Sequence, residues 1–332
     1  MKFATWRGDN NFTIDEEPDP IAGPGEVVVR IETASICGTE VHVTQGLFPN
    51  NPPARLGHEL SGTIVEVGKG VDRTRLGQPV ACDSGSFCRE CFECLSGRTT
   101  RCVEKVSFGG YAEYIKVPEY CTYPVPEGVG LPEASLTEPA SCCLIGLERS
   151  EIPPGASVLV IGGGIMGQMT LGIAKLMGAG TSILSDPVAE RRDMAKQLGA
   201  DIVHDPGETP LRDFIMDVTD GRGVQFSCEA VGKPELVDLA IQLTRKRGTM
   251  EILGVCPKES RLPSDLYDIH FREIKVVCSF GRGDEMSRAL DAMARLNLDG
   301  IIGARYPLEE IGAAFEQAAS ARGMKTAIAP HN

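Results

Sequence analysis

The chain has 332 residues, 42% hydrophobic and 24% charged, which is the composition of a soluble globular protein of about two domains. Acidic residues outnumber basic residues by 46 to 33, so the formal net charge is −13. Nucleic acids and anionic membranes need a cationic surface, and this balance argues against both as main partners.

The sequence begins MKFATW, without the apolar stretch of a signal peptide, and no apolar run is long enough to predict a transmembrane helix. We therefore expect a cytoplasmic protein. In that compartment the twelve cysteines are not expected to form disulfides. Some should bind metal, and the rest should be buried thiols.

The first 145 residues read as β-rich, with apolar runs such as Glu26–Ile31 and Gly62–Val67 between turn residues. From about residue 150, predicted strands and helices alternate, which is typical of a doubly wound α/β domain. The six predicted strands are Val158–Ile161, Ser182–Ser185, Ile202–Val203, Gln225–Cys228, Thr249–Leu253 and Lys275–Ser279. The predicted helices are Ile165–Met177, Val188–Leu198, Leu211–Val218, Glu235–Leu243, Glu285–Leu296 and Leu308–Ala319, before a last strand at Lys325–Ile328.

A glycine-rich turn, GGGIMG, directly follows the strand Val158–Ile161 and opens a helix. It fits the dinucleotide-binding pattern, in which Gly162 permits a tight turn, Gly164 lets the backbone approach a pyrophosphate, and Gly167 lets helix and strand pack closely. Ile165 and Met166 lie inside this turn, where the first amides of the helix would face the phosphates.

Asp186 ends the next predicted strand, 22 residues after Gly164. A carboxylate there would bind the ribose hydroxyls of the adenosine and repel a 2′-phosphate, which favours NAD over NADP. The alternative is that Asp186 caps a helix that begins at Pro187.

Four cysteines follow the spacing C-x2-C-x2-C-x7-C, which suits a closed, tetrahedral, structural zinc site. They are Cys88, Cys91, Cys94 and Cys102. The remaining cysteines outside metal motifs are expected to be buried small residues: Cys82, Cys121, Cys142, Cys143, Cys228, Cys256 and Cys278.

A second candidate metal site combines Cys37 and His42 with the segment Gly57-His58-Glu59. Thiolate, imidazole and carboxylate together suit Zn²⁺, and three protein ligands leave a position for water or substrate. By ligand chemistry alone, surface histidines explain the pattern equally well.

Taken together and in this order, these motifs resemble the zinc-dependent medium-chain alcohol and polyol dehydrogenases over nearly the full chain. The likeness also rests on GYAEY at 110–114 and on the glycines that follow His58 in GHE-x2-G-x5-G. It implies a GroES-like catalytic domain, at 1–147 plus 281–332, with a Rossmann domain for NAD at 148–280 inserted in it.

The resemblance implies that Cys37 and His58 hold the active-site zinc, with Glu59 as a direct or intermittent ligand. Leu136-Thr-Glu138-Pro139 is similar to the sorbitol-dehydrogenase branch, and this makes Glu138 the fourth ligand, directly or through water. The alternative for Glu138 is an acid in the first turn of a helix. A hydroxyl relay through Thr39 and then His42 would carry the proton out.

The same resemblance implies that Asp186 and Arg191 contact the adenosine side of the cofactor. Segments that include Val255 and Ser279 would line the nicotinamide. A homodimer or homotetramer formed through the cofactor domains is expected from the family alone.

Two positions depart from the family pattern. Glu40 stands where the family has an aspartate that orients the zinc-binding histidine, so a shifted backbone or rotamer is needed to make the same bond. The loop Val103–Phe108 is shorter than usual, which predicts a wider or differently shaped substrate pocket.

We therefore expect an enzyme with two zinc ions per chain that interconverts a secondary alcohol and a ketone with NAD. The substrate would be a polyol, sugar derivative, cyclitol or aminocyclitol. Alternatives are an amino-alcohol or hydroxy-amino-acid dehydrogenase of the threonine-dehydrogenase type, and a non-catalytic nucleotide-binding module. The retained metal ligands speak against the module.

Overall fold

A computed structural model describes residues 1–281 and 285–331, and the chain divides into two compact units. The first contains the described residues of 1–138, 282–294 and 299–332; the second contains 139–281 and 295–298. The first boundary lies between residues 138 and 139, inside the helix α4 (Thr137–Ser150). It is nine residues earlier than the boundary expected at 147/148. No helix among the described residues is long and apolar enough to cross a membrane.

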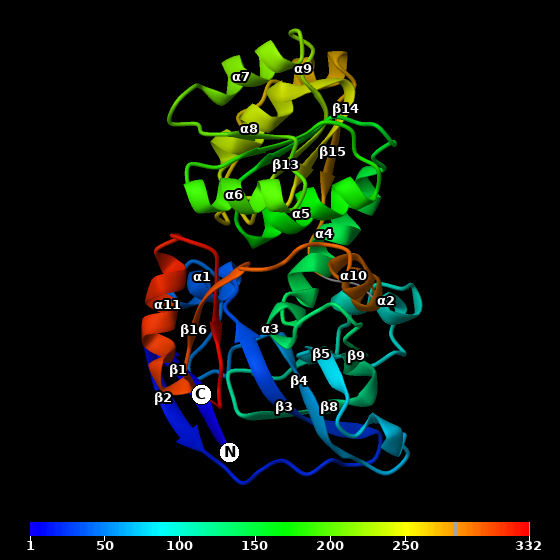
Figure 1. Ribbon diagram of the computed structural model, residues 1–332, viewed down its shortest axis with the longest axis vertical. Coiled ribbons are helices and arrows are strands. Elements are labelled where there is room, and N and C mark those ends of the chain that lie inside the picture. The colour runs from blue at the N-terminus through cyan, green and yellow to red at the C-terminus, as the bar shows by residue number, and fades with distance from the viewer. Residues whose placement is uncertain (282–284, 332) are drawn as a thin grey trace. The chain divides into compact units, whose positions relative to one another are not determined.

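The first unit is built on a seven-stranded sheet in the order β16-β17-β3-β4-β5-β9, in which β8 also pairs with β3. The unit also contains two small two-stranded sheets, β1-β2 and β6-β7, of which β1-β2 is labelled in Figure 1. Its strands are β1 (Lys2–Gly8), β2 (Asn11–Glu16), β3 (Glu26–Ser35), β4 (Glu59–Val67), β5 (Pro79–Asp83), β6 (Gly85–Ser86), β7 (Val106–Ser107), β8 (Tyr114–Pro118), β9 (Thr122–Pro124), β16 (Ile302–Tyr306) and β17 (Lys325–Ile328). Its helices are α1 (Gly38–Thr44), α2 (Phe92–Leu95), α3 (Leu131–Ala134), α10 (Met286–Met293) and α11 (Ile311–Ala319).

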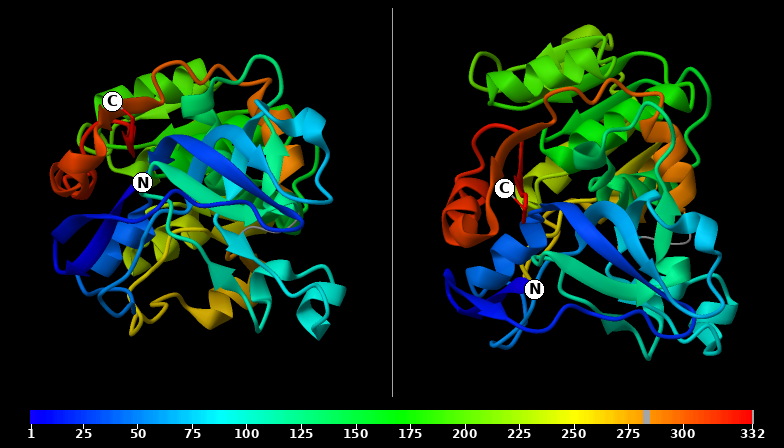
Figure 2. Two further views of the ribbon diagram at one scale, coloured as in Figure 1. Left: turned by 90° about the horizontal axis from the view of Figure 1, so that it is seen from below. Right: turned by 60° about the horizontal axis from the view of Figure 1, so that its bottom comes forward.

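The strand β3 organises this unit because it pairs with β4, β8 and β17. Val27, Val29 and Ile31 of β3 are fully buried in the core together with Leu60 and Ile64 of β4. The strand β17 comes from the end of the described chain, yet it lies beside the blue β3 (Figures 1 and 2). Residues far apart in sequence are thereby brought to one end of the sheet.

The second unit is a six-stranded, fully parallel sheet in the order β12-β11-β10-β13-β14-β15. This is the doubly wound order, and it confirms the predicted Rossmann fold. Its strands are β10 (Val158–Ile161), β11 (Ser182–Ser185), β12 (Ile202–His204), β13 (Val224–Glu229), β14 (Thr244–Ile252) and β15 (Lys275–Cys278). Its helices are α5 (Ile165–Leu176), α6 (Ala189–Gln197), α7 (Leu211–Val218), α8 (Pro234–Leu243) and α9 (Leu266–Phe271).

Two elements of the second unit differ from the sequence expectation. The strand β14 begins at Thr244, five residues before the predicted start, because Arg245, Lys246 and Arg247 extend it in place of a loop. The short helix α9 was not predicted, since none of its residues is buried and its apolar pattern carries no core face.

Candidate active site

Strand pairing assembles the predicted catalytic cluster in the first unit. Ser35 at the end of β3 lies opposite Glu59 at the start of β4. Cys37 follows β3 and forms the N-cap of α1, while His58 directly precedes β4. The candidate ligand atoms of Cys37, His58 and Glu59 consequently lie within 4.8 Å of one another. Thiolate, imidazole and carboxylate form a donor set that suits zinc.

Glu40 orients the histidine of this cluster. Its Oε1 lies 2.9 Å from His58 Nδ1 and accepts a hydrogen bond from the Gly57 amide at 2.6 Å. Its Oε2 accepts hydrogen bonds from the Cys37 amide at 3.2 Å and from the Tyr111 hydroxyl. The longer arm of glutamate thus makes the bond expected of aspartate. This partner assigns the proton to Nδ1 and leaves Nε2 as the metal ligand.

The charges of this network are coupled. Burial would raise the pKa of the Glu40 carboxyl, but His58 and the Tyr111 hydroxyl hold that pKa below its ordinary value. Desolvation opposes a charge on His58, yet the Glu40 carboxylate and Cys37 together raise the pKa of the imidazole well above its ordinary value. Without metal the site therefore holds a proton, which a metal ion must displace to bind.

Glu59 is paired with a lysine from the far end of the described chain. Lys325 Nζ, on β17, lies 2.6 Å from Glu59 Oε2 and 2.8 Å from Oε1, and both side chains are buried. Burial raises the pKa of Glu59 despite this cation. The ion pair gives Glu59 a fixed partner whether or not it also contacts metal.

Glu138 lies in the first turn of α4, as the alternative for this residue proposed, and it is half-buried. It is outside the three-residue group whose ligand atoms lie within 4.8 Å of one another. Its carboxylate is nevertheless close enough to contribute to the raised pKa of Glu59. A role for Glu138 as fourth ligand, direct or through water, remains a prediction.

The two residues of the predicted relay both lie on α1. Thr39 and His42 are three residues apart, which places them on one face of the helix, and both are half-buried. They belong to the same short helix that Cys37 caps, so they are near the cluster in the chain. The relay itself remains a prediction.

Sequence reasoning missed Tyr111 and Lys325. Tyr111 is 1% exposed and lies 71 residues from Glu40, while Lys325 lies 266 residues from Glu59. A signal existed for Lys325, since a single lysine in the apolar segment KTAIA predicts a buried cation that needs an acid partner.

The four-cysteine segment folds into a compact cluster around α2. The Sγ atoms of all four cysteines lie within 4.8 Å of one another. Cys88 Sγ is 3.9 Å from Cys94 Sγ and 3.5 Å from Cys102 Sγ. Four sulfurs about 2.3 Å from one zinc ion would be about 3.8 Å apart, so the spacing fits a tetrahedral thiolate site.

Backbone amides near the four cysteines favour the ionised, thiolate form of the side chains. Amide donors at Cys94 and Val103 lower the pKa of Cys91 to about 6, so this thiol ionises near neutral pH. The Cys88 amide also points at Cys102 Sγ, at 3.3 Å. Hydrogen bonds to sulfur of this kind stabilise the thiolates that zinc requires.

None of the twelve cysteines, all of which lie in the described part of the chain, is in a disulfide. Of the seven expected to be buried small residues, Cys82, Cys121, Cys143 and Cys228 are buried, and Cys142 and Cys256 are half-buried. The prediction is wrong for Cys278, which is exposed. It lies on the edge strand β15, where only one of four residues is buried.

The glycine turn of the second unit has the geometry its pattern predicts. Gly162 has φ +101°, which favours glycine. A Cβ on Gly167 would lie 1.8 Å from the Gly162 carbonyl oxygen, so the helix approaches the turn too closely for any side chain. Gly164 is the N-cap of α5, and Ile165 and Met166 begin the helix.

Asp186 stands directly after β11 and supports the turn from the side. Its Oδ2 accepts a hydrogen bond from the Gly163 amide at 2.7 Å and lies 3.7 Å from Arg191 Nη1. Its Oδ1 accepts from the Val188 amide at 2.8 Å, the local role given by the alternative reading, although α6 begins only at Ala189. Asp186 is 4% exposed, with its carboxylate fixed beside the turn.

The residues predicted for the nicotinamide side lie in two different settings. Val255 is 40% exposed. Ser279 is half-buried and donates a hydrogen bond to Glu251 Oε1 at 3.1 Å. Sequence reasoning missed Glu229, which is fully buried at the end of β13 and accepts hydrogen bonds from the amides of the loop that follows it. This carboxylate shapes the loop that faces the glycine turn, because a Cβ on Gly162 would meet Val231 of that loop.

Comparison with known proteins decides the family. Residues 23–127 match the alcohol dehydrogenase GroES-like domain, and residues 166–295 match the zinc-binding dehydrogenase domain. The chain belongs to the zinc-dependent medium-chain dehydrogenase family. It is thus a zinc-dependent dehydrogenase, in a family that typically has two zinc ions per chain and a nicotinamide dinucleotide cofactor.

Its relatives in this family act on different substrates. It is 33% identical to the L-threonine 3-dehydrogenase of Pyrococcus abyssi, over 86% of each chain. It is 29% identical to the sorbitol dehydrogenase of Bacillus subtilis, over 96% of this chain and 93% of that one. A zinc-binding dehydrogenase from Sinorhizobium meliloti, solved with NADP bound, has 31% identity and a TM-score of 0.91 over 99% of both chains.

Proposed function

We propose that this enzyme oxidises a secondary alcohol of a polyol, sugar derivative or cyclitol to the ketone with NAD⁺, and catalyses the reverse. The observation that carries the proposal is the Cys37–His58–Glu59 cluster with the Glu138 carboxylate beside it. An acidic, oxygen-rich ligand set resembles the polyol branch of the family. Similarity to sorbitol dehydrogenase over nearly the whole chain supports it.

Cys37, His58 and Glu59, with Glu138 directly or through water, would hold the catalytic zinc, and Cys88, Cys91, Cys94 and Cys102 the structural one. When bound, zinc would supply Lewis acidity toward the substrate oxygen, and NAD would supply the hydride acceptor. Glu40 accepts from His58 Nδ1, which would leave Nε2 unprotonated and able to bind the metal. Thr39 and His42 would pass the substrate proton to solvent along α1.

In the second unit, Gly162, Gly164, Ile165, Met166 and Gly167 would cradle the pyrophosphate at the start of α5. Asp186 would bind the ribose hydroxyls and so select NAD, with Arg191 beside it. Val255 and Ser279 would line the nicotinamide.

A homo-oligomer formed through the nucleotide-binding units and a cytoplasmic location are further parts of this proposal. The first follows from the family likeness, and the lack of disulfides among the twelve described cysteines supports the second. Size-exclusion chromatography with light scattering would test the oligomer, and a monomer at micromolar concentration would contradict it.

The test of function is NAD⁺ reduction by the zinc-loaded enzyme against polyols, cyclitols, amino alcohols and hydroxy amino acids, including L-threonine. We expect the highest kcat/KM on a polyol or cyclitol and at least tenfold less with NADP⁺. If the enzyme with two bound zinc ions reduced NAD⁺ with none of the polyols or cyclitols, the proposal would be wrong.

L-threonine is the second candidate substrate, because a threonine dehydrogenase shares 33% of its residues with this chain. A kcat/KM that is highest on L-threonine would replace the polyol assignment. The metal and cofactor assignments would be unaffected by that result.

A further inference from the structure

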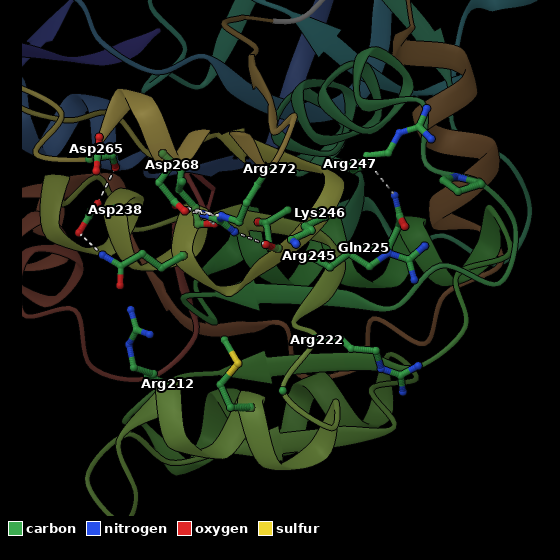
Figure 3. Close-up of a pocket in the computed structure, with 17 residues that line it drawn as sticks. Arg212, Arg222, Gln225, Asp238, Arg245, Lys246, Arg247, Asp265, Asp268 and Arg272 are labelled. Atoms are coloured by element: carbon green, nitrogen blue, oxygen red, sulfur yellow. Dashed lines mark hydrogen bonds and ion pairs between the residues drawn. The ribbon is translucent and has the colours of Figure 1, made fainter. Parts of the chain in front are cut away.

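The second unit holds an open cavity of about 1270 Å³ that the dehydrogenase chemistry does not use. It is lined by α7, α8 and α9 and by the first residues of β13 and β14 (Figure 3). Because the sheet is parallel, those first residues lie at the sheet edge opposite the glycine turn. None of the lining residues belongs to that turn or to the Asp186 segment, so the cavity is separate from the cofactor site.

The cavity is cationic in an acidic protein. Six basic residues line it: Arg212, Arg222, Arg245, Lys246, Arg247 and Arg272. Three acids line it, which leaves a formal excess of 6 − 3 = +3 in a chain whose net charge is −13.

All three acids are engaged by the protein itself. Asp238 accepts hydrogen bonds from two side chains of the cavity. Asp265 caps α9 by accepting from a first-turn amide at 2.8 Å. Asp268 pairs with Arg272 at 2.5 Å. Asp238 and Asp265 have neutral donors and keep their charge, whereas Asp268 pairs with Arg272. Two further acids outside the lining, Asp220 and Glu273, pair with Arg222 and Arg247. The cations without an acid partner among the described residues are therefore Arg212, Arg245 and Lys246.

Part of the positive charge has an ordinary structural role. Arg272 donates to the carbonyls of Thr244 and Ile241, at 2.7 and 3.1 Å, where α8 ends. Arg222 donates to the Thr219 carbonyl at 3.1 Å, where α7 ends. Cations at helix C-termini satisfy free carbonyls and the helix dipole. Arg212 cannot have this role, since it lies in the first turn of α7.

Arg212 and Arg245 have no side-chain partner among residues 1–281 and 285–331. Arg212 lies on the α7 side of the cavity, and Arg245 lies across from it with Lys246 (Figure 3). Lys246 has only the Phe271 ring near it, with Nζ 5.7 Å from the centroid. Unpaired guanidinium groups are thus presented from two walls of one cavity.

The backbone that carries three of these cations is strained. Val224 pairs with Thr244 and Phe226 with Thr249, so residues 245–248 bulge from the ladder. Arg247 has φ +59°, a left-handed conformation that costs a non-glycine residue about 1 kcal/mol. Strain of this kind is concentrated at functional sites.

We propose that this cavity binds a small polyphosphorylated molecule, with Arg212 and Arg245 as the main phosphate ligands. Guanidinium groups match phosphate oxygens with two parallel hydrogen bonds. Cations on two walls of the cavity favour a ligand with several phosphate groups, and the volume leaves room for one. The inference does not depend on the substrate or on the dehydrogenase activity.

The test uses inorganic tripolyphosphate as the probe, titrated calorimetrically into the zinc-loaded enzyme saturated with NADH. Saturation keeps the probe out of the pyrophosphate site of the cofactor. We expect one-to-one binding that weakens at least tenfold in R212Q/R245Q. The matched control is R73Q/R322Q, which neutralises two exposed arginines of the first unit and should bind the probe as the parent does.

Dehydrogenase activity of both variants should equal that of the parent, which also shows that they fold. The titration is then repeated with ATP, to distinguish a site for a nucleotide from a site for a phosphate chain. A higher affinity for ATP than for tripolyphosphate would show that the nucleoside contributes to binding. No binding by the parent enzyme, or equal binding by R212Q/R245Q, would overturn the proposal. Equal weakening by R73Q/R322Q would overturn it too, because binding would then follow net charge alone.

Discussion

The two candidate metal clusters of the first unit are built in opposite ways. The four thiols come from one stretch of fifteen residues, Cys88 to Cys102, which folds on itself around α2. The Cys37–His58–Glu59 cluster joins the ends of two paired strands, and its buried cation, Lys325, arrives from a third. Substitutions in the four-cysteine cluster should affect only that segment. Formation of the Cys37–His58–Glu59 cluster should instead depend on correct pairing of the whole sheet.

The largest expected effect comes from removing a ligand of the assembled cluster. His58→Ala should lower turnover at least about a thousandfold, because the zinc loses the imidazole that Glu40 orients. NADH binding, measured by fluorescence, should stay near normal since the nucleotide turn lies in the other unit. Turnover above a few per cent of the parent rate would show that His58 is not a ligand.

A substitution in the four-cysteine cluster should affect metal content and folding stability. Cys91→Ser should lose one zinc per chain by mass spectrometry and several kcal/mol of folding stability, because binding at such sites is coupled to folding. The matched control is Cys278→Ser, an exposed cysteine outside both clusters, which should change neither. A Cys91→Ser protein that keeps two zinc ions per chain would contradict the four-thiolate assignment.

The buried ion pair tests how far the assembled cluster depends on the last strand. Lys325→Met should cost about 3 to 5 kcal/mol in denaturant unfolding, because Glu59 is left as an unpaired buried charge. Adding Glu59→Gln should recover much of this loss. The control Lys275→Met breaks an exposed pair with Glu151 and should cost at most about 1 kcal/mol. Equal losses in the two lysine variants would show that burial of the pair is unimportant.

Glu251 of the second unit is a buried carboxyl that lacks such a cation. Burial raises its pKa from 4.5 to about 7, although hydrogen bonds from Ser279, at Oε1, and from Cys228 oppose this rise. The folded state therefore keeps the proton longer than the unfolded state does. Stability should fall as pH rises from about 4.5 to about 7, by on the order of 3 kcal/mol in total, and stay lower above that.

Denaturant unfolding at several pH values, with the parent compared with Glu251→Gln, measures this contribution. The amide cannot ionise, so the difference between the two proteins should change across pH 5 to 7 and level off above. A difference that is constant with pH would show that Glu251 ionises at its ordinary pKa.

The smallest expected effect concerns the outermost member of the assembled cluster. Tyr111→Phe removes the hydroxyl that holds Glu40, and should weaken zinc affinity at the catalytic site about tenfold, the lower end for residues that orient metal ligands. The control Tyr120→Phe removes a hydroxyl that bonds only the Phe87 carbonyl, and should leave zinc affinity unchanged. Unchanged affinity in both variants would limit Tyr111 to packing.

The contrast between the clusters also explains what could be predicted from the sequence. The strands of the second unit were clear because residues such as those of β10 are buried on both faces and form short apolar runs. The thiol spacing was sufficient for the local cluster. Cys37 and His58 needed the family resemblance, since only the pairing of β3 with β4 brings them together.

Other features had no local signal. The bulge at the start of β14 has a charged sequence that reads as a loop, and its strand character comes from β13 beside it. The hydroxyl of Tyr111 and its contact with Glu40 depend on core packing across 71 residues. Contacts between residues far apart in the sequence depend on the tertiary fold, so a single sequence does not predict them.

The position of Lys325 also sets an order of events during synthesis. The ribosome adds about 5 to 20 residues per second, so the 266 residues between Glu59 and Lys325 take on the order of 10 to 50 seconds to make. The nucleotide-binding unit is made during that interval and ends at residue 298, before Lys325 is added, and until then Glu59 has no lysine to neutralise it. The Glu59–Lys325 pair is therefore among the last contacts of the newborn chain to form, so the Cys37–His58–Glu59 cluster cannot reach its final charge state until the chain is nearly complete.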